Sequence, residues 1–212
     1  MTFDVVILSG GTARRLGGID KPALVIGGRP LLETAIAAGR AAGAARVVVV
    51  GPSRGSADLA VREEPPGSGP VPALRRGLAE VTSDWLALLA ADLPFVRAQH
   101  LTELLAAARA AGAVLIDNED RAQWLVSCWQ TATLRTALAS YTGDSLRGLL
   151  APLTPARIHP ADEAWLDCDT PADVARARQH PSPGSLPERP PGPLPGGPPG
   201  RLPERPPGRL SM

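Results

Sequence analysis

The chain has 212 residues, which is enough for one domain of ordinary size with a short extension. Its 22 Lys and Arg residues nearly balance its 21 Asp and Glu residues, and aromatic residues make up only 3% of the chain. These values exclude a nucleic-acid-binding protein, because such a surface needs clustered basic residues or aromatic rings on which bases stack.

The first residues of the chain contain only a short apolar run, and no apolar stretch approaches the roughly 18 residues of a membrane span. The two cysteines, Cys128 and Cys168, have neither the number nor the spacing of a disulfide framework or a zinc site. We therefore expect a cytoplasmic protein without a membrane anchor, in which both thiols are reduced.

Composition divides the chain near residue 180. Half of the 24 prolines fall in the last 32 residues, where the segment Leu-Pro-Glu-Arg-Pro-Pro-Gly occurs twice. Proline and glycine at this density prevent regular helices and sheets. We predict a folded domain over residues 1–180 and a disordered, polyproline-like tail over residues 181–212.

Short apolar runs alternate with Ala- and Leu-rich stretches along residues 1–180. In chain order we predict a strand at 5–9, a helix at 31–43, strands at 47–50 and 61–63, a helix at 72–81, a strand at 85–91, a helix at 98–111, strands at 113–116 and 124–129, helices at 131–140 and 146–150, and a last helix that begins with Thr170, Pro171 and Asp173. This alternation predicts a single Rossmann-like α/β domain, with a mostly parallel sheet between two layers of helices.

Ligands of such folds bind at the carboxyl ends of the strands. Residues 9–21, Gly51, Asp92 and residues 167–170 all lie at or just after predicted strand ends. We therefore expect them to converge on one cleft.

A glycine-containing loop follows the first strand and includes Gly10 and Gly11. It matches neither of the two common phosphate loops. Its glycines would nevertheless let backbone N–H groups approach phosphate oxygens, and Arg15 and Lys21 can neutralise a triphosphate. The loop predicts a nucleotide site.

The segment LSGGTARRLGGIDKPALVIGGRPLLE resembles the N-terminal signature of the molybdenum cofactor guanylyltransferase family of MobA-like NTP transferases. Later matches are EEPPGSGPVPAL, AADLP and LDCDTP, so the resemblance covers residues 5–178 and leaves out the tail. It implies a fold of the nucleotide-diphospho-sugar transferase type. It also implies Mg²⁺-dependent transfer of GMP from GTP to the phosphate of molybdopterin, with release of pyrophosphate.

The resemblance also assigns residues. Arg15, Lys21 and Asp92 would be catalytic, and Asp92 and Asp169 would hold Mg²⁺, with Asp167 as the other carboxylate near the metal. The implied nucleotide-binding residues are Leu8, Ser9, Gly10, Gly11, Lys21, Glu64 and Asp92.

The molybdopterin side is less sharply defined. Trp124 resembles a family position near the pterin, and Ser145 and Arg147 open a predicted helix that could bind a phosphate. The sequence departs from the family pattern at three places. Gly51-Pro52-Ser53 replaces a common Asn, Glu64 replaces Asp, and Asp-Cys-Asp-Thr-Pro replaces Asn-x-Asn-Thr-Pro.

No protein nucleophile is required, because the acceptor phosphate attacks the α-phosphorus of the nucleotide. We accordingly expect His100, His159 and His180 to be solvated. The expected ligands are GTP and molybdopterin, the expected protein partner is a molybdoenzyme or its chaperone, and the expected state is a monomer or weak oligomer. Open alternatives are a cytidylyltransferase for the same cofactor, a transferase for a sugar phosphate or phospholactate, and a non-catalytic cofactor-binding protein.

Overall fold

The computed structural model describes residues 1–10, 21–52 and 55–179, and these are the residues discussed below. The chain divides into two units, Met1–Ser182 and Pro183–Met212. The predicted tail lies outside the described residues, so its disorder stays a prediction. No helix in the described part of the chain is long and apolar enough to cross a membrane.

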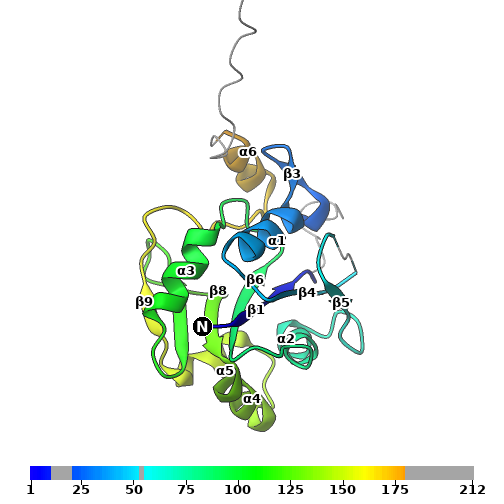
Figure 1. Ribbon diagram of the computed structural model, residues 1–212. Helices are drawn as coiled ribbons and strands as arrows, with labels where there is room; N and C mark the ends of the chain where they lie inside the picture. The colour runs from blue at the N-terminus through cyan, green and yellow to red at the C-terminus, as the bar shows by residue number, and fades with distance from the viewer. Residues whose placement is uncertain (11–20, 53–54, 180–212) are drawn as a thin grey trace, which may run out of the picture. The chain divides into compact units, whose positions relative to one another are not determined.

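A seven-stranded sheet forms the centre of the first unit, in the order β5-β4-β1-β6-β8-β7-β9 (Figure 1). The strands are β1 (Phe3–Leu8), β4 (Arg46–Val50), β5 (Leu59–Val61), β6 (Trp85–Ala90), β7 (Gly112–Ile116), β8 (Ala122–Gln130) and β9 (Ala156–Ile158). Strands β4, β1 and β6 are parallel, as are β4 with β5 and β7 with β9. Only β8 runs antiparallel to its neighbours β6 and β7. The prediction of a mostly parallel sheet is confirmed.

Helices cover both faces of the sheet (Figure 1). They are α1 (Leu31–Ala41), α2 (Pro70–Leu78), α3 (Ala98–Ala107), α4 (Thr131–Ser140), α5 (Leu146–Leu150) and α6 (Pro171–Gln179). Residues of α1 and α3 share one core with Val5 and Ile7, whereas residues of α2, α4 and α5 share another with Val6 and Leu8. Side chains of β1 alternate between the two cores, which is why the strand is continuously apolar apart from Asp4. The predicted three-layer architecture is confirmed.

Several element boundaries differ from the prediction. Helix α3 ends at Ala107 instead of Ala111, because the carbonyl of Ala111 accepts a hydrogen bond from Gln130 N at the edge of the sheet. The third strand ends at Val61, two residues earlier than predicted. Strand β9 and the hairpin of β2 (Val25–Ile26) and β3 (Arg29–Pro30) were missed, because two or three residues give no readable periodicity.

Candidate active site

The candidate site lies where parallel strands end side by side. Ser9 N donates to the carbonyl of Val50 at 2.8 Å, which joins the ends of β1 and β4. Ala91 N donates to the carbonyl of Leu8 at 3.1 Å, which joins the ends of β6 and β1. The residues that follow these strands therefore meet at one edge of the sheet, as the sequence predicted.

A segment from far along the chain reaches the same edge. The amide of Cys168 donates to the carbonyl of Asp92 at 3.3 Å. The Cys168 side chain is buried in a small core that includes Phe95 and Val174. This packing fixes the backbone on either side of Cys168 and so brings Asp167 and Asp169 beside Asp92.

Lys21 lies between two of these carboxylates. Its Nζ forms a hydrogen-bonded ion pair with Asp169 Oδ1 and lies 3.7 Å from Asp92 Oδ2. The Lys21 side chain is only 18% exposed, so its charge is largely withdrawn from bulk water. The structure thus brings together Lys21, Asp92 and Asp169, three residues that the sequence placed in one site.

The charges of this cluster perturb one another. Burial alone lowers the pKa of Lys21, but the hydrogen bond to Asp169 and the nearby carboxylates of Asp92 and Asp167 raise it overall. Burial raises the pKa of Asp92, and Asp169 adds to this effect against the attraction of Lys21. Desolvation, followed by the charges of Asp169 and Asp92, raises the pKa of Asp167 to about 6. A site with this excess of carboxylates favours additional cations.

Asp169 is not the residue that caps the following helix. Thr170 N and Thr170 Oγ1 donate to Asp173 Oδ2 at 2.7 and 2.8 Å, and Asp173 N donates back to Thr170 Oγ1 at 3.2 Å. This is the reciprocal capping box that the sequence predicted at the start of α6. It leaves the Asp169 carboxylate directed at Lys21.

A cavity of about 640 Å³ extends from this cluster. Its lining includes Asp92, Asp167 and Asp169 together with the three residues predicted on the molybdopterin side, Trp124, Ser145 and Arg147. Trp165 also lines it and was missed, although its place two residues before Asp167 could have indicated it. The Ser145 hydroxyl accepts a hydrogen bond from Gly148 N at 3.0 Å and thereby caps α5.

The position of Trp124 depends on an irregularity in β8. The pairing of β7 with β8 shifts between Val114 and Leu115, whose partners are Ser127 and Gln123. Three residues of β8, including Trp124, therefore bulge from the β7–β8 ladder. Ser127 Oγ fixes the bulge by donating to the Trp124 carbonyl at 2.7 Å. A bulge re-aims side chains, and such irregularities are common beside functional sites.

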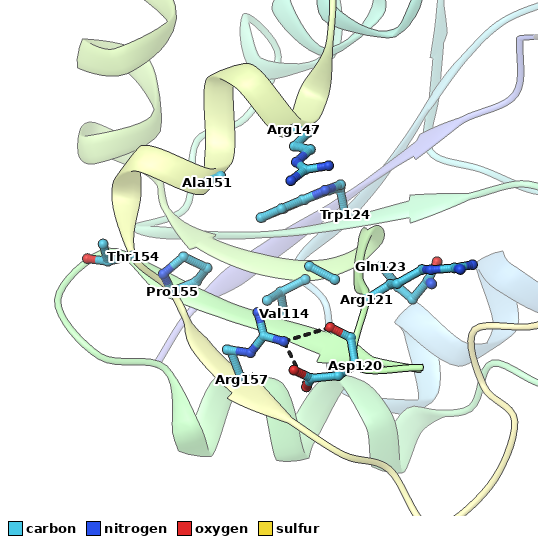
Figure 2. A pocket seen from close by; sticks show the side chains of 11 residues that line it. Val114, Asp120, Arg121, Gln123, Trp124, Arg147, Ala151, Thr154, Pro155 and Arg157 are labelled. Atoms are coloured by element: carbon cyan, nitrogen blue, oxygen red, sulfur yellow. Dashed lines mark hydrogen bonds and ion pairs between the residues drawn. The ribbon is translucent and has the colours of Figure 1, made fainter. Parts of the chain in front are cut away.

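A second cavity, of about 690 Å³ (Figure 2), shares Ala122, Gln123, Trp124 and Arg147 with the first. Figure 2 shows the guanidinium of Arg147 beside the Trp124 ring. Arg157 on the opposite wall is already paired, because it donates to the backbone oxygen and the carboxylate of Asp120, each at 2.8 Å. Among the described residues, Arg147 is the basic residue that lines both cavities.

The glycine loop is described only in part. Leu8 and Ser9 are buried and Gly10 is exposed, while Gly11 and Arg15 lie outside the described residues, so their predicted roles stay predictions. Glu64 has an exposed side chain, whereas that of Glu63 is turned inward and is only 5% exposed. The predicted nucleotide contact of Glu64 therefore stays a prediction, and the burial of Glu63 was not predicted.

One histidine prediction is wrong. His159 is exposed and His180 lies outside the described residues, but His100 is 1% exposed. Its Nδ1 accepts from Arg97 N at 3.0 Å and its Nε2 lies 2.9 Å from Asp162 Oδ1. The ring is buried because it caps the start of α3, and this burial lowers the pKa of His100 in spite of Asp162.

The fold and the charged site are those of a nucleotidyltransferase: parallel strands end beside a half-buried lysine and a pair of carboxylates. The family model of the MobA-like NTP transferase domain matches residues 5–159, so the chain belongs to this family. The fold and the match to the family model both confirm the family resemblance of the sequence motifs.

Two relatives carry more specific names. The chain is 30% identical over 191 residues to a probable molybdenum cofactor guanylyltransferase of Synechococcus elongatus, with 82% of this chain and 96% of the relative covered. It is 31% identical over 184 residues to the molybdenum cofactor guanylyltransferase of Cereibacter sphaeroides, with 81% and 93% covered. Among solved structures, a nucleotidyl transferase from Methanothermobacter thermautotroptrophicus superposes with a TM-score of 0.72 at 20% identity, with 84% of this chain and 96% of that one covered. This last likeness concerns the fold alone.

Proposed function

We propose that the protein transfers GMP from GTP to the terminal phosphate of molybdopterin, with release of pyrophosphate and with Mg²⁺ as cofactor. The observation that carries this proposal is the cluster of Lys21, Asp92 and Asp169 at the end of a cavity. It belongs to a chain about four fifths of which aligns with molybdenum cofactor guanylyltransferases.

In this reaction an oxygen of the acceptor phosphate forms a bond to the α-phosphorus of GTP. The bond from the α-phosphorus to the bridging oxygen breaks, and pyrophosphate leaves with the electron pair. Lys21 would transfer its contact from the carboxylates to the phosphates and stabilise the charge that develops on them. Arg15, in the glycine loop, is proposed as a second phosphate ligand.

The donor set suits Mg²⁺. No group of three or more metal-ligating side chains occurs among the described residues, but this metal typically takes one or two protein carboxylates together with substrate phosphates. Asp92 and Asp169 are two such carboxylates, and they already flank one cation, the Lys21 ammonium. When bound there, Mg²⁺ would neutralise phosphate charge and help to align the triphosphate.

The cavities favour a large, flat acceptor. The cavity at Asp92 is about 640 Å³, and it shares Trp124 and Arg147 with the second one, of about 690 Å³. A phospholactate or a simple sugar phosphate would leave much of this space unfilled, whereas a phosphorylated pterin could stack on the Trp124 ring. The guanidinium of Arg147 supplies a positive charge beside that ring.

The test is pyrophosphate release from each of the four NTPs with Mg²⁺ and molybdopterin. We expect release from GTP alone, and none from the Asp92→Asn variant, which keeps the shape of the side chain and removes its charge. Preference for CTP would show the cytidylyltransferase, and release only with another phosphorylated acceptor would overturn the molybdopterin assignment. We further propose that the product passes to a molybdoenzyme or its chaperone in the cytoplasm, and that the protein acts as a monomer or weak oligomer.

A further inference from the structure

The carboxylates of Asp167 and Asp169 lie on a segment that is neither helix nor strand. The segment comprises residues 159–170, between the end of β9 and the start of α6. Near its end, Cys168 N donates to the carbonyl of Asp92 at 3.3 Å, and the Cys168 side chain packs in a small buried core. Contacts at this end fix one point of the segment, and a contact further back is needed to fix its direction.

Asp162 makes such a contact with the start of helix α3. Its Oδ1 lies 2.9 Å from Nε2 of His100, and its Oδ2 lies 3.7 Å from Nη1 of Arg97. Arg97 is the N-cap of the helix and His100 is its third residue, so the helix dipole also favours a carboxylate at this place. Apart from the imidazole, Asp162 Oδ1 has no hydrogen-bond partner among the described residues, although this atom is buried. The position of Asp162 therefore depends on His100.

The backbone determines which proton the His100 ring presents to Asp162. The ring is 1% exposed, and its Nδ1 accepts a hydrogen bond from Arg97 N at 3.0 Å. In the neutral ring the proton is therefore on Nε2, which faces the carboxylate as a donor. The side-chain amide of Gln99 lies 3.3 Å from the same nitrogen, which is further than Asp162. His100 thus binds the helix start with one nitrogen and the 159–170 segment with the other.

The two contacts hold two stretches of chain against each other. His100 comes eight residues after Asp92, and Asp162 comes six residues before Cys168. Besides desolvation, the charges of Asp169 and Asp92 raise the pKa of Asp167, so these carboxylates repel one another. Contacts at both ends of the paired stretches oppose this repulsion.

We propose that His100 and Asp162 are positioning residues of the metal site, which hold Asp167 and Asp169 beside Asp92. Neither residue lines the cavity at Asp92, so they act through the 159–170 segment and not on the reacting atoms. The arriving cation then meets carboxylates that are already close together. This inference rests on the proposed use of Mg²⁺ with GTP.

Uptake of Mn²⁺, which prefers the same oxygen ligands as Mg²⁺, tests the proposal in the presence of the α,β-methylene analogue of GTP. The electron paramagnetic resonance signal of free Mn²⁺ gives the dissociation constant without any measurement of activity. Asp162→Ala removes the contact with His100 and leaves the hydrogen bonds at the start of α3 in place. The control is Glu163→Ala, because Glu163 is similarly exposed and also forms an ion pair, but with Arg176 of α6.

A second pair of variants changes the other partner. Glutamine and glutamate at the third residue of a helix both accept a hydrogen bond from the N-cap amide, so His100→Gln and His100→Glu keep the bond from Arg97 N. The glutamine amide can also donate to Asp162, whereas the glutamate carboxylate repels it. The two variants therefore share the helix cap and differ in the contact with Asp162.

We expect Asp162→Ala and His100→Glu to weaken Mn²⁺ binding about ten- to hundredfold, as loss of a residue that orients metal ligands typically does. Glu163→Ala and His100→Gln should change it less than about twofold. Unchanged binding in Asp162→Ala would overturn the inference.

Equal weakening by Asp162→Ala and Glu163→Ala, or by both His100 variants, would also overturn it, because general loosening of the segment or of the helix would explain that result. Circular dichroism shows whether each variant folds, and if His100→Glu does not, the comparison of Asp162→Ala with Glu163→Ala decides. If the unchanged protein takes up no Mn²⁺ with the analogue, the proposed use of a divalent metal itself fails.

Discussion

Removal of the Lys21 charge should weaken the fold and make its stability depend on Mg²⁺. Lys21→Met keeps the length of the side chain but leaves Asp92, Asp167 and Asp169 close together without their shared cation. Unit charges 3.7 Å apart, as for Lys21 and Asp92, attract by about 4 kcal/mol at an effective dielectric constant of about 20.

Part of that attraction is offset in the folded protein. Lys21 and its carboxylate partners lose hydration on folding, and the Asp169 side chain is still 40% exposed to screening by water. The net stabilisation by the ion pairs of Lys21 is therefore about 2 kcal/mol, between the values typical of surface and buried pairs. For a domain of this size, that loss lowers Tm by about 4–8 °C. Differential scanning calorimetry would measure it.

The control is Arg76→Met, which removes the ion pair between Arg76 of α2 and Glu80, just beyond the end of that helix. It should lower Tm by about 1 °C, the effect of a partly exposed ion pair between residues four apart. Millimolar Mg²⁺ should recover part of the loss in Lys21→Met and none in Arg76→Met, because only the first leaves several carboxylates close together without a cation. Equal Tm values for Lys21→Met and the unchanged protein, or no response to Mg²⁺, would refute this reasoning.

Three further outcomes are expected. Trp124→Leu should raise the KM for molybdopterin about tenfold through loss of ring stacking and leave the KM for GTP unchanged, as steady-state kinetics would show. Asp4→Ala should lower the free energy of unfolding by about 3 kcal/mol in urea titrations, because the buried Asp4 carboxylate accepts from Thr82 N and Ser83 N at 2.7 and 3.1 Å. The pKa of His100 is lowered from 6.5 in the folded chain, so below pH 6.5 the unfolded chain binds a proton that the folded chain does not. Tm should therefore fall as the pH drops below 6.5, and His100→Asn should make this fall less steep. An unchanged slope in His100→Asn would mean that other groups control acid stability.

Much of the candidate site could be predicted because its residues stand at fixed places relative to strand ends. Asp92 directly follows an apolar strand, and Thr170 and Asp173 form a local capping box. These patterns depend on neighbours within a few residues along the chain. Lys21 joined the prediction because lysine after a glycine loop is suited to phosphate.

The prediction for His100 was wrong, and the burial of Glu63 was not predicted, because burial of a polar side chain depends on tertiary contacts. Strand β5 ends two residues earlier than its composition indicated, and in an extended chain adjacent side chains point to opposite sides. The end of this strand therefore decided which of two adjacent acids turns inward. His100 is buried because its ring accepts from Arg97 N and faces Asp162, a residue 62 positions further on whose approach no local pattern reports.

The alternation of strands and helices by itself predicted the α/β fold, and the glycine loop predicted a nucleotide site, since each depends on local residue chemistry. The transferase activity came from the resemblance of the motifs to a known family. Tertiary structure alone decided that β8 runs antiparallel between β6 and β7, that its bulge aims Trp124 between two cavities, and that Glu63 faces Gly10. Pairing between distant strands sets these features, because the register of one strand on another fixes which side chains point into a shared space.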